Sequence, residues 1–171
     1  MRALALIVAV AFIAGCQASA SQGPSTSAGS SGVGAAASPS AAPAGKVYRI
    51  GQQIVAGPFE FTVAEAKQIA SLGSFTGQYK PAAGNVFFEA RISMESSAAG
   101  DYSELDFTVE DASGRSYANN QQNSQALGSG SLPVGRLVSG WVSFEVPVGV
   151  AGRMTLVYTT RPAPPIRIRL F

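Results

Sequence analysis

Residues 84–96, GNVFFEARISMES, carry the pattern that decides the fold of this chain. From Phe88 to Met94, apolar side chains alternate with polar or charged ones. A period of two is typical of a β-strand with one buried and one solvated face. We therefore expect Phe88 and every second residue after it to face a hydrophobic core, and Glu89 to face solvent.

The same alternation recurs in three other stretches after residue 45. The expected inward residues are Phe59, Phe61 and Val63 in the first stretch, Leu105, Phe107 and Val109 in the second, and Val142, Phe144 and Val146 in the third. Further strands are expected at 47–50, 115–118, 153–158 and 166–170, and residues 64–72 are expected to continue a strand into a loop rather than to form a helix. Seven or eight short strands, with no convincing long amphipathic helix, predict an all-β fold, an antiparallel β-sandwich.

Two glycine-containing stretches are expected to be connections. Residues 111–114, DASG, place Asp first and Gly last, which is the preference of a type I turn. Residues 128–131, GSGS, lack the Lys and the following helix that a phosphate-binding loop needs, so we expect a plain loop there.

The front of the chain has the form of an export signal. Arg2 is followed by an apolar run that ends at Ala14, which is shorter than the ~20 residues of a transmembrane helix. The tetrapeptide IAGC that closes the run resembles the bacterial lipobox, in which the cysteine thiol receives diacylglycerol before cleavage. We therefore expect residues 1–15 to be a lipoprotein signal peptide and Cys16, the only cysteine, to be the site of a lipid anchor in a membrane.

Residues 16–45 are expected to be a disordered linker behind that anchor. Ala, Ser, Gly and Pro make up most of the segment, and residues 3–45 contain no charged residue. Such a composition cannot bury enough apolar surface to offset the conformational entropy of the chain. The folding unit is therefore expected to be residues 46–171, which suits one domain.

Charge and residue types exclude several classes of function. A formal net charge of +2 gives no electrostatic footprint for nucleic acid. The absence of histidine removes the commonest general base and the commonest transition-metal ligand, and a single cysteine excludes an intrachain disulfide and a Cys-based zinc site. We expect a protein that is not an enzyme and that needs no cofactor.

Four segments share features with one family of domains. They are residues 51–63 (GQQIVAGPFEFTV), 84–96, 109–117 (VEDASGRSY) and 132–147 (LPVGRLVSGWVSFEVP). The last has a Pro-Gly turn, a Gly before the strand and a Phe-Glu-Val-Pro strand end, and the third has an Asp-x-x-Gly-x-x-Tyr turn. Together they resemble a family of bacterial exported domains of unknown function, related in fold to a small secreted immunoprotective extracellular antigen. The resemblance covers about residues 46–171 and implies an immunoglobulin-like sandwich behind a lipoprotein signal. It transfers no catalytic residue, because the family has no established site.

Acidic residues gather around the 105–110 stretch. Five carboxylates fall within eleven residues, at Asp101, Glu104, Asp106, Glu110 and Asp111. Hard oxygen ligands suit Ca²⁺, but the spacing fits no EF-hand. Because Glu104, Asp106 and Glu110 are expected on the outward face of one strand, plain solvated alternation is favoured over a metal site or over the paired carboxylates of a glycoside hydrolase.

Residues 119–125, NNQQNSQ, form the most unusual stretch of the folded part. Seven consecutive uncharged polar residues lie in a connection that extends to about Leu132, longer than most loops. Amides both donate and accept hydrogen bonds, which suits recognition of a glycan or a peptide. The candidate ligand-binding residues, in a loop expected to be solvated, are Asn119, Asn120, Gln121, Gln122, Asn123 and Gln125.

Three arginines gather near the C-terminus, at Arg161, Arg167 and Arg169. The last two alternate with Ile166, Ile168 and Leu170, so we expect them on the outer face of a strand. The alternative is contact with anionic lipid or cell-wall polymer near the anchor.

The sequence favours a lipid-anchored domain, displayed outside the cytoplasmic membrane, that acts by binding an envelope protein or glycan. One alternative is an envelope glycan-modifying hydrolase, which would show a deep pocket with convergent carboxylates of shifted pKa. Another is an assembly role beside a second envelope protein, which a large exposed apolar patch would favour.

Overall fold

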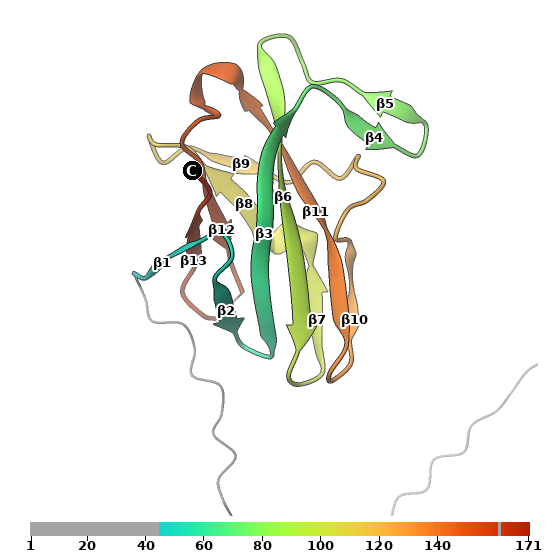
Figure 1. Cartoon of the computed structure of the whole chain (residues 1–171), viewed down its shortest axis with the longest axis vertical. Helices are drawn as coiled ribbons and strands as arrows, with labels where there is room; N and C mark the ends of the chain where they lie inside the picture. Colours follow the sequence, from blue (N-terminus) through green and yellow to red (C-terminus); the bar gives the residue numbers. More distant parts are fainter. Residues whose placement is uncertain (1–44, 161) are drawn as a thin grey trace, which may run out of the picture. The chain divides into compact units, whose positions relative to one another are not determined.

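The computed structural model describes residues 45–160 and 162–171 (Figure 1). The expected signal peptide, the lipid site Cys16 and nearly all of the linker therefore lie outside the described residues, as does Arg161. In the described part the regular elements are strands and two short 3₁₀ turns. That part contains no helix long and apolar enough to cross a membrane.

The longest strands form a four-stranded antiparallel sheet. Its order is β11 (Leu137–Pro147), β6 (Asn85–Ser96), β3 (Phe59–Ile69), β2 (Gln53–Ala56). The pairing of β3 with β6 shifts by a bulge between Val63 and Glu65, and β3 then continues to Ile69, so the expectation of a strand rather than a helix is confirmed.

A five-stranded sheet packs against the first. Its order is β1 (Val47–Arg49), β13 (Ile166–Arg169), β12 (Thr155–Tyr158), β8 (Phe107–Glu110), β9 (Ser116–Ala118). The pairing of β1 with β13 is parallel, whereas the other named pairings of the described strands are antiparallel. In Figure 1 the sheet with β3, β6 and β11 lies in front of β8 and β9.

Two short strand pairs and two turns complete the fold. The strand pairs are β7 (Gly100–Ser103) with β10 (Ser129–Leu132), and β4 (Leu72–Ser74) with β5 (Gly77–Tyr79). The 3₁₀ turns are η1 (Glu104–Asp106) and η2 (Val148–Val150). The structure thus contains strands that the sequence did not predict, namely β2, β4, β5, β7 and β10. The last four show no apolar alternation.

The core lies between the two large sheets and contains nearly all of the residues expected to face inward. Phe61 of β3 meets Phe107 of β8 edge-on at 5.9 Å between ring centroids, and meets Tyr158 of β12 at 5.0 Å. Because these rings come from both sheets, they join the two layers. Core residues run from Tyr48 to Leu170, which all lie within the range 46–171 that we expect to fold as one domain.

Leu105 is an exception, since its side chain is 57% exposed. The expected strand begins only at Phe107, because η1 precedes it and the Ser103 hydroxyl accepts a hydrogen bond from the backbone N–H of Leu105. A 3₁₀ turn rotates successive side chains by about a third of a turn instead of half a turn, so the alternation breaks there. The expectation for Leu105 was therefore wrong.

The two expected connections have different outcomes. The turn at residues 111–114 is confirmed, with Gly114 at φ +85° and its N–H donating to the Asp111 carbonyl at 3.0 Å. Residues 128–131 are not a plain loop, because all but the first belong to β10 and pair with β7. Backbone pairing with β7 forms this strand, although its sequence shows no apolar alternation.

Phe88, Phe107 and Phe144 have no exposed surface. Replacing any one of them by Ala should lower the free energy of unfolding of the 46–171 fragment by about 3–5 kcal/mol, through lost burial and a cavity. Phe75→Ala is the control, because Phe75 is 89% exposed and should change stability by less than about 0.5 kcal/mol. Urea unfolding measures both, and equal effects would contradict this core.

Candidate functional site

Residues 119–125, here called the amide segment, run along the outer edge of β11. Asn119 forms an isolated antiparallel bridge with Phe144, and Ala126, just after the segment, forms a parallel bridge with Trp141. The Trp141 N–H donates to the Gln125 carbonyl at 3.0 Å, and the Leu127 N–H donates to the Trp141 carbonyl at 2.9 Å. The segment therefore covers an edge of the sheet that would otherwise be open.

Asn119 and Asn123 fasten the amide segment. The Asn119 side chain donates to the Glu104 carbonyl at 3.2 Å and accepts from the Ser143 N–H at 3.1 Å. Asn123 is only 6% exposed, and its amide donates to the Glu89 carboxylate at 2.5 Å and to the Ser143 hydroxyl at 3.0 Å. The segment is thus not the uniformly solvated loop that its composition predicts.

The side chains of the amide segment other than Asn119 and Asn123 are half-buried or exposed. Asn120 is half-buried, and its side-chain oxygen accepts from the Gln122 N–H at 3.1 Å, which forms a local turn. The side chains of Gln121, Gln122 and Gln125 are exposed. Of the sequence-predicted ligand residues, these three glutamines are the ones whose side chains are presented to solvent on an anchored backbone.

Glu89 lies beneath this segment and is 5% exposed, so the expectation that it faces solvent was wrong. Its side chain does point away from the core, but Asn123 covers it. Burial raises the pKa of Glu89, while the hydrogen bond from Ser143 and the charge of Lys67, 4.0 Å away, act in the opposite direction. Lys67 also lies 4.0 Å from the centre of the Trp141 ring.

An open groove of about 380 Å³ lies beside Trp141 on the outer side of the sheet. Its lining residues are Arg91, Gln125, Ser139, Gly140 and Trp141. Strand register places Trp141 directly opposite Arg91. The groove therefore combines an aromatic ring, a guanidinium group, an amide and a hydroxyl, a set that can stack on a ring and hydrogen-bond its substituents.

Gly140 allows the chain after the amide segment to approach β11. A Cβ atom at this position would lie 2.4 Å from the Leu127 Cα and 2.8 Å from the Ala126 carbonyl carbon. Both are backbone atoms, which cannot rotate away. Glycine at this position is therefore a structural condition for the groove.

A second apolar layer supports the same face of the sheet. Leu72 of β4 and Phe87 of β6 have no exposed surface, although both lie outside the main core. Tyr79 of β5 packs against Phe87 with 5.6 Å between ring centroids. The Ser124 N–H donates to the Gly73 carbonyl at 2.8 Å, so this hairpin and the amide segment are joined.

The structure separates the acidic residues that are close in sequence. Glu104 does not share an outward face with Asp106 and Glu110, because η1 turns it inward, where it is 7% exposed. Its carboxylate accepts from the Gly128 N–H at 3.1 Å. Burial raises the pKa of Asp106, as it does that of Glu89.

Glu110 takes part in an ion pair, and Asp111 stabilises a turn. Glu110 forms an ion pair with Arg167, and this hydrogen-bonded partner raises the pKa of Arg167. The Ser113 hydroxyl and the Tyr117 hydroxyl donate to Asp111, whose pKa falls to about 2. Over residues 45–160 and 162–171, no group of three or more potential ligands is placed to hold a metal ion.

Comparison with known families identifies the domain. Residues 48–164 match the family model described as a domain of unknown function, DUF4352. The chain belongs to this family. The resemblance seen in the sequence is thereby confirmed, and no curated protein sequence matches the chain.

Solved structures similar to this DUF4352 chain include a β-sandwich protein of Clostridium difficile and a secreted protein of Mycobacterium tuberculosis. The yjhA protein of Bacillus subtilis has 20% identity and a TM-score of 0.53, covering 72% of this chain and 99% of that one. The secreted protein MPT63 of Mycobacterium tuberculosis has 15% identity and a TM-score of 0.56, covering 76% and 98%. The ycdA protein of B. subtilis, described as a candidate lipoprotein, has 13% identity and a TM-score of 0.53, covering 68% of this chain but only 37% of that one. These similarities confirm the sandwich fold.

Several residues of the DUF4352 groove were missed by sequence reasoning, among them Trp141, Arg91 and Ser139. Trp141 is the only tryptophan and alternates with inward residues of β11, so a large aromatic residue on a solvent-facing position was the available signal. What placed Gln125 beside it was the path of the amide segment.

Asn123→Ala should destabilise the domain by about 1–3 kcal/mol, because it removes the buried amide that donates to both Glu89 and Ser143 and leaves these two only the hydrogen bond between them. Gln121→Ala should change stability by less than about 0.5 kcal/mol, because its side chain is exposed. Urea unfolding of both variants measures the difference. Equal stabilities would show that the amide segment is not fastened through Asn123.

Proposed function

We propose that this chain is a lipoprotein outside the cytoplasm, and that its DUF4352 domain is a non-catalytic binding module for an envelope glycan. The observation that carries the proposal is the groove in which Trp141, Arg91 and Gln125 meet. Sugar rings stack on aromatic faces through their C–H groups, and their hydroxyls pair with amides and guanidinium groups. The anchored backbone of the amide segment lowers the entropic cost of ordering its glutamines.

Location rests on the front of the chain. Cys16 closes the lipobox-like tetrapeptide and is the only cysteine. Of the structurally similar proteins, one is described as secreted and another as a candidate lipoprotein. Both descriptions support placing this chain outside the cytoplasm.

The surroundings of Glu89, whose pKa is raised by burial, support a non-catalytic role. Glu89 is covered by the Asn123 amide and the Ser143 hydroxyl, and its charge is met by Lys67. A hydrolase would need a carboxyl group that reaches the substrate with a second one across a cleft. In the 380 Å³ groove the lining residues include no carboxylate.

Trp141→Ala should weaken binding of the 46–171 fragment to immobilised oligosaccharides from bacterial envelopes by about 2 kcal/mol, or about thirtyfold in Kd, because an aromatic anchor is lost. Gln125→Ala should weaken binding less. Phe75→Ala is the aromatic control, since Phe75 is exposed at the tip of the β4–β5 hairpin.

The control also separates the rival functions. Capture of an envelope protein that is lost with Phe75→Ala and kept with Trp141→Ala would favour an assembly role. Release of sugar fragments from the oligosaccharides by the wild-type fragment would favour a hydrolase.

Cys16→Ala should leave an unprocessed precursor without lipid, because the thiol that receives diacylglycerol is gone. Mass spectrometry of the protein from bacterial membranes measures this. An unmodified Cys16, or a mature N-terminus at another residue, would refute the lipoprotein part of the proposal.

A further inference from the structure

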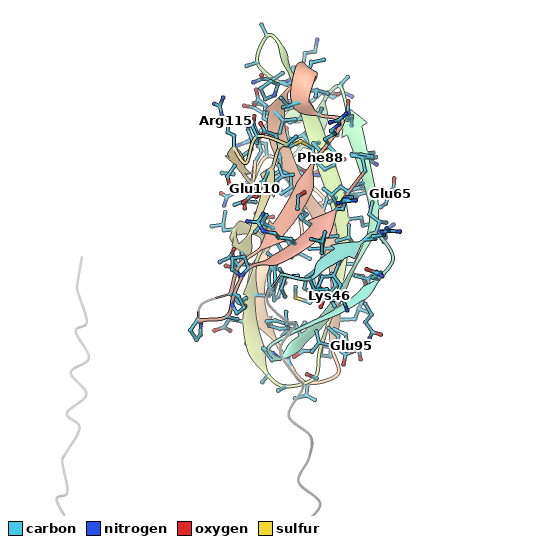
Figure 2. All side chains as sticks on the ribbon, turned by 90° about the vertical axis from the view of Figure 1, so that its left-hand side faces the viewer. Lys46, Glu65, Phe88, Glu95, Glu110 and Arg115 are labelled. Carbon is cyan, nitrogen blue, oxygen red and sulfur yellow. The ribbon has the colours of Figure 1, made fainter. Side chains whose placement is uncertain are left out.

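The outer side of the five-stranded sheet carries a basic face near β1 and β13. We define this face by Arg49 of β1, Arg153 before β12, and Arg167 and Arg169 of β13. Figure 2 views the molecule from the side of β1 and β13, with Lys46 and Glu110 labelled. Ile166 and Ile168 of β13 are buried, which confirms the expected outward position of the two arginines between and after them.

Strand register brings two of these charges together. Arg49 and Arg169 are direct partners across the parallel pairing of β1 with β13, and both side chains are exposed. Like charges directly opposite each other on neighbouring strands destabilise a sheet. An external anion between them would relieve that repulsion.

Among the four arginines of this face, only Arg167 forms an ion pair with a carboxylate of the described residues. Glu110 forms its ion pair with Arg167. For Arg49, Arg153 and Arg169, no carboxylate of the described residues lies within 4.0 Å. The three guanidinium groups are therefore available to a ligand, whereas Arg167 is held by its partner.

A groove of about 490 Å³ opens between these arginines. Arg153, Arg169, Thr155 and Phe171 are among its lining residues, and no Asp or Glu side chain lines it. An adjoining groove includes Asp111, but the carboxylate of Asp111 already accepts four hydrogen bonds from its own turn and from Tyr117. The groove thus offers two guanidinium groups and a hydroxyl to an anionic oxygen.

Exposed apolar side chains flank the arginines. Val47 of β1 is 48% exposed, and Phe171, which lines the groove, is 54% exposed. Val47 is the direct partner of Arg167 across the strands. Basic residues interspersed with exposed apolar ones are typical of a surface that rests in the interface of a membrane.

We propose that this basic face docks on an anionic phospholipid membrane, with Arg49, Arg153 and Arg169 contacting lipid phosphates. The inference rests on the proposed lipid anchor: the expected linker ends at residue 45 and β1 begins at Val47, so the chain from the anchor enters the domain at this face. Tethering raises the local concentration of lipid at the face, so weak contacts suffice.

The test measures sedimentation of the 46–171 fragment, which lacks Cys16, with vesicles of equal parts phosphatidylglycerol and phosphatidylcholine. Its outcome is therefore independent of lipidation and of glycan binding. Each basic side chain close to an anionic surface strengthens binding about fivefold, so the triple variant Arg49→Gln, Arg153→Gln, Arg169→Gln should bind roughly a hundredfold more weakly. Added salt should weaken binding of the wild-type fragment.

The matched control is the triple variant Lys80→Gln, Arg91→Gln, Arg136→Gln. These side chains are also exposed and lie outside the five-stranded sheet. Residues 46–171 contain eleven basic and ten acidic residues, so either variant leaves eight basic residues against ten acidic ones. Thermal unfolding checks that both variants fold.

Retained vesicle binding in the control, with loss in the first variant, supports the proposal. Equal loss in both variants would show a net-charge effect without a docking face and would overturn it. Equal binding to pure phosphatidylcholine vesicles, or stronger binding to soluble poly(glycerol phosphate) than to vesicles, would also overturn it, the latter in favour of an anionic wall polymer.

Discussion

An uninterrupted antiparallel pairing of β6 with β11 is the constraint on which the rest of this domain depends. It runs from Asn85 opposite Pro147 to Glu95 opposite Leu137 without a bulge. Since side chains alternate between faces, this single register sends Phe88 and Phe144 into the core and sends Glu89, Ser143 and Trp141 to the other face. A slip by one residue would exchange the two sets.

Polar residues on that outer face form hydrogen bonds to the amide segment, which covers part of the face. Asn123 reaches Glu89 and Ser143, and together they satisfy hydrogen bonds that burial would otherwise leave open. Asn119 and Asn123 thus serve the fold, and the exposed glutamines are held in place by these two residues. Fastening of this kind is the physical basis for treating a polar, glutamine-rich connection as a binding element.

The two sheets differ in what their outer faces offer. The four-stranded sheet presents an aromatic ring with amide and guanidinium neighbours, which suits an uncharged or weakly charged sugar. On the five-stranded sheet, the single ion pair of Glu110 with Arg167 leaves the neighbouring arginines uncompensated. Under the two proposals, one side of the sandwich would bind a glycan and the other would rest on a membrane.

The sequence by itself determined the sandwich, the inward residues of its long strands and the 111–114 turn, because alternation and turn chemistry are local properties of the chain. It also marked the amide segment as unusual. Tertiary structure alone decided that Glu89 and Asn123 are buried, that Glu104 turns inward and that Arg49 lies opposite Arg169. The partners of Glu89 and Arg49 are distant in sequence, and the hydrogen bonds of η1 override the alternation at Glu104. Residue spacing does not encode which segment will cover an outward-facing side chain.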